Sequence, residues 1–276
     1  MKFQLKALVA ALALVAAVPA QAALNNPFTT GNGSLVLTVF DSANNISALF
    51  DLGLNYSDFS IAGTSFPASN ALTANYSWNL TANGLNNGIQ GDYATAWSTF
   101  AATANEAGAS WAVVAGDNLG AGAGSRGYIS TFTNTGVLGP NNSSVTVQAL
   151  ANLGNYTDAA GVAAVQNHST TANGGSVSLI STAGYYLPYY LADKNSNSGE
   201  IAIGAINSSL DVIQRTTGSG NLVQTTNTIF TDAKFTLTSA GQLSYTTVAA
   251  VPEADTWAMM LLGLGFMGFV ARRKQA

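Results

Sequence analysis

Short segments in which apolar and polar residues alternate fill most of the chain, and turn residues separate them roughly every ten positions. Alternation with a period of two is the pattern of a strand that buries one face. The segments that follow this pattern are 34–40, 48–54, 76–80, 111–115, 128–133, 145–150, 177–181, 201–206, 212–216, 228–231, 234–238 and 243–248. We therefore expect a mainly β fold: a single β-sandwich or jelly-roll-like domain spanning residues 23–250, with a closing hairpin at 239–242.

Two segments interrupt the alternation and predict one or two short helices. Asp92 is placed to cap a helix from Tyr93 to about residue 107, with Trp97 and Phe100 on one face. Asp158 is likewise placed to cap an alanine-rich helix that ends near residue 167. The chain has no cysteine, so packing and sheet hydrogen bonds must stabilise the domain without disulfides.

The first 22 residues have the organisation of a secretory signal peptide. Lys2 and Lys6 precede an apolar stretch at 7–18, and Ala20-Gln21-Ala22 forms a small-x-small cleavage site. We expect export through the Sec translocon and cleavage by signal peptidase before Ala23.

The C-terminal 26 residues predict a membrane anchor. The apolar run at 257–271 is about 15 residues long and would span roughly 22 Å as a helix, at the lower limit for a single transmembrane helix. Trp257 lies where an interfacial aromatic is expected, and Arg272, Arg273 and Lys274 follow the run. Because positive charge stays on the cytoplasmic side, residues 23–250, which we call the body, are expected outside the cytoplasm.

These C-terminal residues resemble the PEP-CTERM sorting signal of Gram-negative bacteria. Val251-Pro252-Glu253 matches its first element, and Ala254 stands where the family has a second proline. The rest of the resemblance is carried by Trp257, Gly263, Gly265, Gly268, Arg272 and Arg273. It implies anchoring in the inner membrane, cleavage near Pro252–Glu253 by an exosortase, and release or transfer to the cell surface. It also implies a link with exopolysaccharide and biofilm production.

Charge and composition exclude several classes of function. Residues 23–250 contain four lysines and arginines against eleven aspartates and glutamates, a formal charge of −7, which opposes binding to nucleic acid. With one histidine, His168, and no cysteine, a hydrolytic triad or a zinc site lacks its usual residues. We therefore expect a non-enzymatic protein without a cofactor.

Three further site hypotheses remain open for residues 23–250. Exposed tyrosines on an edge strand could stack on sugar rings; the candidates are Tyr185, Tyr186, Tyr189 and Tyr190. A loop with alternating oxygen-bearing side chains could bind calcium through Asp193, Asn195, Asn197 and Glu200. Two aspartates near turns could form the carboxylate pair of a glycosidase; the candidates are Asp41, Asp51, Asp58 and Asp92.

The sequence thus leaves three functions to compare. The first is a non-enzymatic protein of the cell surface or extracellular matrix. The second is a carbohydrate-binding lectin or adhesin, and the third is a secreted glycoside hydrolase.

Overall fold

The computed structural model describes residues 24–59, 75–120, 125–133, 143–161, 174–180, 185, 203–218 and 226–247. The predicted signal peptide, its cleavage site at Ala20, Ala22 and Ala23, and the predicted helix at 257–271 lie outside these residues. Within the described part of the chain, every helix is too short or too polar to cross a membrane.

The described residues form mainly antiparallel β structure, which confirms the predicted class. The elements are β1 (Ser34–Asp41), β2 (Ile46–Asn55), α2 (Tyr56–Phe59), β3 (Tyr76–Asn79), β4 (Asn83–Asn86), β5 (Ile89–Asp92), α3 (Ala94–Thr103), β6 (Ser110–Asp117), β7 (Gly127–Phe132), α4 (Ser143–Gly161), β8 (Gly175–Leu179), β9 (Gly204–Ala205), β10 (Ser209–Thr216), β11 (Thr226–Leu237) and β12 (Gln242–Thr247). One sheet runs in the order β3-β12-β11-β10-β7-β6-β1-β2-β8, and β9 pairs with β6 beside it. The β4–β5 hairpin forms a separate two-stranded sheet.

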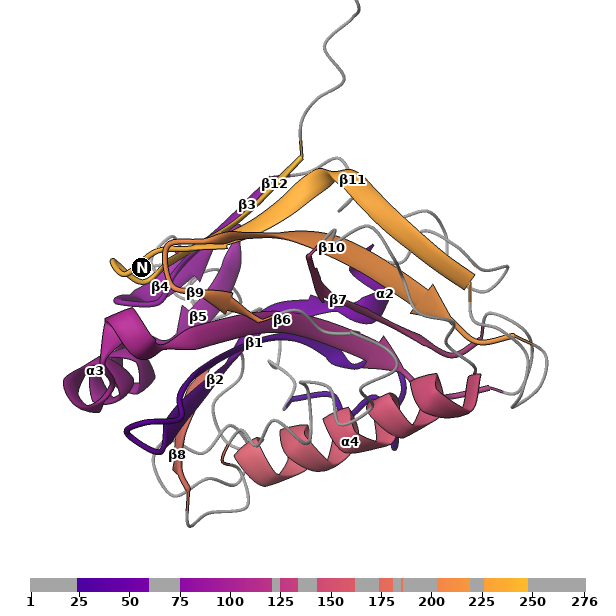
Figure 1. The fold of residues 1–276 in the computed structure, drawn as a ribbon, viewed down its shortest axis with the longest axis horizontal. Coiled ribbons are helices and arrows are strands. Elements are labelled where there is room, and N and C mark those ends of the chain that lie inside the picture. Colours follow the sequence, from indigo (N-terminus) through magenta and orange to yellow (C-terminus); the bar gives the residue numbers. More distant parts are fainter. Residues whose placement is uncertain are drawn as a thin grey trace, which may run out of the picture.

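The large sheet curls so that its inner face closes on itself, an arrangement consistent with a β-sandwich. In Figure 1, β3, β12, β11 and β10 lie above β6, β1 and β2. Trp78 and Tyr245 pack around Phe235 in the upper half, with ring centroids 6.4 and 4.9 Å away. The same core contains Leu37, Phe50 and Trp111 of the lower half.

Helix α3 closes one side of this core with the residues that the sequence predicts. Trp97 and Phe100 are buried, and the Trp97 ring lies 6.2 Å from that of Phe50. The predicted cap and the predicted end are wrong. Asp92 belongs to β5, and the first N–H of the helix, that of Ala94, donates to the side chain of Asn83 at 2.8 Å. The helix ends at Thr103, before a 3-10 turn at Glu106–Gly108.

Helix α4 covers the opposite face of the sheet and corrects a second prediction. Leu150, Leu153 and Tyr156 pack on Val36 and Val114 in a separate apolar cluster. Segment 145–150 is therefore helix and not strand, and Asp158 lies within the same helix instead of capping another. The alternation of Val145 and Val147 resembles a strand, but the three-residue spacing of the buried side chains is helical.

Two further differences concern β11 and the β4–β5 hairpin. Segments 228–231 and 234–237 belong to one strand, β11, which is bent in Figure 1. Its register with β10 shifts between Asp211 and Val212. The hairpin was not predicted, although its turn is Asn87-Gly88 with φ values of 54° and 82°. Positive φ at both turn positions suits the Asn-Gly pair and the twist of a two-residue hairpin.

Candidate functional site

Four neighbouring strands present a polar surface on the side opposite the core. We call it the outer polar face. It consists of Ser77 and Asn79 on β3, Gln242, Ser244 and Thr246 on β12, Lys234 and Thr236 on β11, and Ser209 and Asp211 on β10. The residues that alternate with them, such as Trp78, Phe235 and Leu243, are fully buried. The period of two along each strand therefore separates this face from the core.

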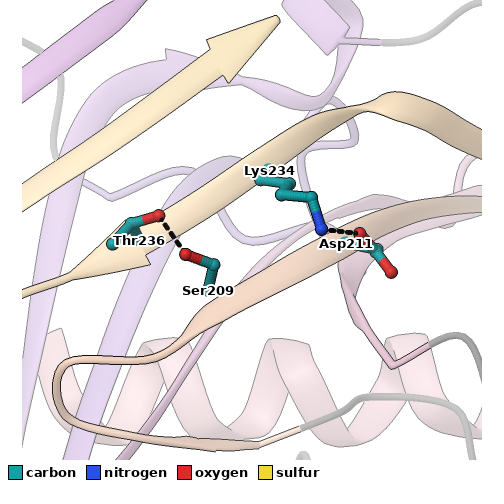
Figure 2. Close-up of polar contacts among 4 residues, drawn as sticks. All are labelled: Ser209, Asp211, Lys234 and Thr236. Carbon is teal, nitrogen blue, oxygen red and sulfur yellow. Dashed lines mark hydrogen bonds and ion pairs between the residues drawn. The ribbon is translucent and has the colours of Figure 1, made fainter. Parts of the chain in front are cut away.

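Hydroxyl side chains form a row in register across the outer polar face. Ser77 pairs with Ser244, Ser244 with Thr236, and Thr236 with Ser209. The Ser209 and Thr236 hydroxyls point toward each other in Figure 2, and their oxygens lie 2.7 Å apart. Hydroxyls of this kind can both donate and accept hydrogen bonds, so the row offers an uncharged polar ligand several contacts.

The charged groups of this face neutralise each other. The Lys234 ammonium lies 2.9 Å from the Asp211 carboxylate across β10 and β11 (Figure 2). Their side chains are 53% and 23% exposed, so water weakens the attraction and the pair contributes little stability. The face is thus electrically neutral within a body that is acidic overall.

Asp41, a candidate carboxylate, is part of the β1–β2 turn. It is buried and accepts four hydrogen bonds, from the backbone N–H groups of Ala43, Asn44 and Asn105 and from the Asn44 side chain. Burial acts to raise its pKa, but these hydrogen bonds outweigh burial and hold the pKa below 3.8. A carboxylate so engaged is a structural turn residue.

Asp51 lies on β2 and is also buried. Its carboxylate accepts the backbone N–H of Gly53 at 3.0 Å and the hydroxyl of Ser34 at 3.3 Å. Burial raises its pKa to about 6, because these two hydrogen bonds only partly offset the loss of water. This is the clearest electrostatic perturbation of a carboxylate in the described chain.

The strand register separates the two buried carboxylates. Asp51 pairs with Val36, five residues along β1 from Asp41, so the two backbone positions are roughly 17 Å apart. Glycosidase carboxylates lie about 5–9.5 Å apart. Asp58 accepts the backbone N–H of Asn55 at 2.8 Å, and Asp92 ends β5 with one carboxylate oxygen buried and unpaired. The structure does not bring Asp41 and Asp51 together as a catalytic pair.

The remaining predicted site residues fall mostly outside the described chain. Tyr185 is described and is only 4% exposed, and burial together with the charge of Asp41 raises its pKa. Tyr186, Tyr189 and Tyr190 are not described, nor are Asp193, Asn195, Asn197 and Glu200. Sugar stacking by these three tyrosines and the calcium loop therefore stay predictions.

Sequence reasoning did not find the outer polar face. The alternation in segments 234–238 and 243–248 places Lys234, Thr236, Ser244 and Thr246 on one side of β11 and β12. What could not be foreseen is that β3, more than 160 positions earlier in the chain, completes the same surface.

Comparison with known proteins gives one match. No curated protein and no solved structure matches the chain. The family model described as the PEP-CTERM protein-sorting motif matches residues 250–274. This confirms the resemblance seen at Val251, Pro252 and Glu253 and in the glycines and arginines that follow. The motif implies export, membrane anchoring before processing, an exosortase as the processing partner and sorting to the cell surface. The chain carries a PEP-CTERM protein-sorting motif at its C-terminus.

Proposed function

We propose that residues 23–250 are a non-enzymatic component of the cell surface or extracellular matrix, linked to exopolysaccharide or biofilm. The observation that carries this proposal is the sorting motif at 250–274. Export by Sec and cleavage by signal peptidase at Ala22–Ala23 belong to the same proposal. The motif determines where the body is delivered, and the outer polar face is the surface that it would offer there.

The buried carboxylates support a structural body. Asp41 and Asp51 accept hydrogen bonds from their own turn and strand, which leaves few lone pairs for a substrate. Neither is exposed to solvent by more than 2%. A general acid or base must come within hydrogen-bonding distance of its substrate, so both residues are poor candidates for that role.

Fractionation of the producing cells tests the proposal. We expect the body outside the cytoplasm, with an intact mass that lacks residues 1–22 and the segment after the cleavage site near Pro252. Replacement of Glu253 by Ala should leave export intact and retain the body in the membrane fraction. Full-length protein in the cytoplasm would refute the proposal.

A carbohydrate-binding lectin or adhesin is the second candidate, and the in-register hydroxyl row favours it. Neutral polysaccharides present many hydroxyls, and a row of side-chain hydroxyls can match them by hydrogen bonding. Retention on the exopolysaccharide of the producing cell should fall in the double variant Thr236→Ala, Ser244→Ala. The matched control is Ser98→Ala, Thr99→Ala on α3, whose hydroxyls bond to Thr95 within the helix. Equal retention of both variants would exclude the row as the binding surface.

A further inference from the structure

The last strand that the structure describes lies very close in sequence to the sorting motif. Strand β12 ends at Thr247, and the motif match begins at residue 250. The last residue of the strand is held in place, because its N–H donates to the side-chain carbonyl of Asn75 at 2.9 Å. Asn75 immediately precedes β3, the neighbouring strand. Thr247 is therefore anchored to the neighbouring strand, five positions before Pro252; we call residues 248–252 the tether.

Covalent geometry limits how far the cleavage site can lie from the body. From Thr247 to Pro252 there are five residues, which span at most about 17 Å when fully extended. A single helix with its side chains is about 10–12 Å across. A membrane-embedded enzyme that surrounds this site with more than one helix must therefore reach the body.

We propose that the end of the body around Thr247 contacts the exosortase during processing, and that this contact slows cleavage. The inference rests on the proposed sorting function. The contact surface comprises the exposed side chains nearest the tether: Asn75, Ser77, Lys234 and Thr246. Thr246 pairs with Lys234 across β12 and β11, so these side chains lie on adjacent strands.

The chemistry of this surface determines the sign of the effect. Its exposed members are amide, hydroxyl and ammonium groups, whereas tight interfaces depend on buried aromatic or aliphatic anchors. The contact therefore supplies little binding energy and acts mainly as a steric obstacle. Lengthening the tether should relieve it.

The first experiment changes the length of the tether. Inserting about 12 Gly/Ser residues between Val248 and Ala249 adds a flexible segment whose own root-mean-square end-to-end distance is roughly 20 Å. In cells that carry the exosortase, pulse-chase labelling should show several-fold faster conversion to the processed form. The control places the same insert between Ser239 and Ala240, in the turn at the other end of β12, and leaves the tether unchanged. Conversion at the original rate, or more slowly, with the longer tether would overturn the proposal.

The second experiment locates the contact directly. A photoreactive phenylalanine analogue at Thr246 should cross-link to an epitope-tagged exosortase, because this exposed residue lies beside the tether. The same analogue at Ala240 should not, since this exposed residue lies in the turn before β12, at the end of the strand away from Thr247. Equal cross-linking from both positions, or none from Thr246, would contradict the proposed surface.

A third position separates this inference from the sorting function itself. The analogue at Ala254 lies within the motif and should cross-link whenever the exosortase binds the tail. Cross-linking from Ala254 but not from Thr246 would overturn only the proposed contact. Absence of both cross-links and of processing would overturn the sorting function as well.

Discussion

The side-chain carbonyl of Asn87 accepts the backbone N–H of Ser77 at 2.8 Å, along the outer edge of β3. Asn86 does the same for Asn79, also at 2.8 Å. Strand β3 is the last strand on this side of the sheet, and an edge strand with free N–H groups can pair with another chain. The Asn86 and Asn87 side chains of the β4–β5 hairpin therefore occupy the positions that a neighbouring strand would take.

Replacing Asn87 by glycine should expose part of this edge. Glycine keeps the positive φ of 54° but removes the acceptor, so the free energy of unfolding should fall by about 1 kcal/mol. Sedimentation velocity should also show concentration-dependent self-association. Asn87→Asp is the control, because it retains an acceptor oxygen and tolerates this backbone conformation. Equal stability of the glycine and aspartate variants would show that the hydrogen bond from Ser77 to the side chain at position 87 contributes nothing to stability.

Asp51 should make the body more stable in mild acid. Its pKa in the folded state is about 6 against 3.8 ordinarily, so the folded state binds the proton more tightly than the unfolded state. This contribution is complete below pH 3.8 and is lost as the pH rises through 6, a total of roughly 3 kcal/mol. Asp51→Asn should remove this dependence and raise the urea midpoint at pH 7.5. A wild type and variant with parallel stability curves between pH 4 and 7.5 would refute this.

Asp41 should have the opposite dependence on pH. Its folded pKa lies below 3.8, so its contribution is present above that value and is lost as the pH falls through the folded pKa. Asp41→Asn replaces one acceptor oxygen with a donor that faces the Asn44 amide and the Asn105 N–H. The free energy of unfolding at pH 7 should fall by about 1–3 kcal/mol, and the difference from wild type should shrink at pH 3. Chemical denaturation at the two pH values measures it.

One buried hydrogen bond between α4 and the sheet can be measured by a double-mutant cycle. The hydroxyls of Thr38 and Tyr156 lie 3.0 Å apart, and both side chains are fully buried. Tyr156→Phe and Thr38→Val should each lower the free energy of unfolding by about 1–2 kcal/mol, because each leaves the other hydroxyl with fewer partners. The double variant should cost less than the sum. Strictly additive losses would mean that the two hydroxyls do not interact.

The sequence predicts those parts of this fold in which local pattern and burial agree. Segment 34–40 became β1 because its alternate residues are buried in two different clusters, one on each face of the sheet. The strand prediction for segment 145–150 is wrong because its short alternation of valines suits either a strand or a helix. Only the fit of Leu150 and Leu153 against β6 decides between them, and that fit depends on distant residues.

Asparagine side chains carry another part of the fold that sequence alone could not supply. The α3 cap comes from Asn83, eleven positions before the N–H that it accepts. The hydrogen bond that holds the end of β12 comes from the side chain of Asn75, 172 positions before Thr247. Local capping rules consider the adjacent residue, here Asp92, and so cannot identify partners that only tertiary pairing brings near. The outer polar face was missed for the same reason.

Strands β7 and β10 approach each other closely at Gly127, which has no side chain. A Cβ at this position would overlap the backbone carbonyl oxygen of Arg215 on β10 and would lie 2.6 Å from the Tyr56 hydroxyl. The carbonyl cannot move without disturbing the β7–β10 ladder, so Gly127→Ala should lower the free energy of unfolding by about 1–3 kcal/mol. Gly108→Ala is the control, since its nearest non-adjacent atom would be 4.0 Å away and its effect should stay within about 0.5 kcal/mol. Thermal and urea unfolding of both variants measure these changes. A Gly127→Ala protein as stable as the control would mean that β7 and β10 accommodate the added methyl group without losing stability.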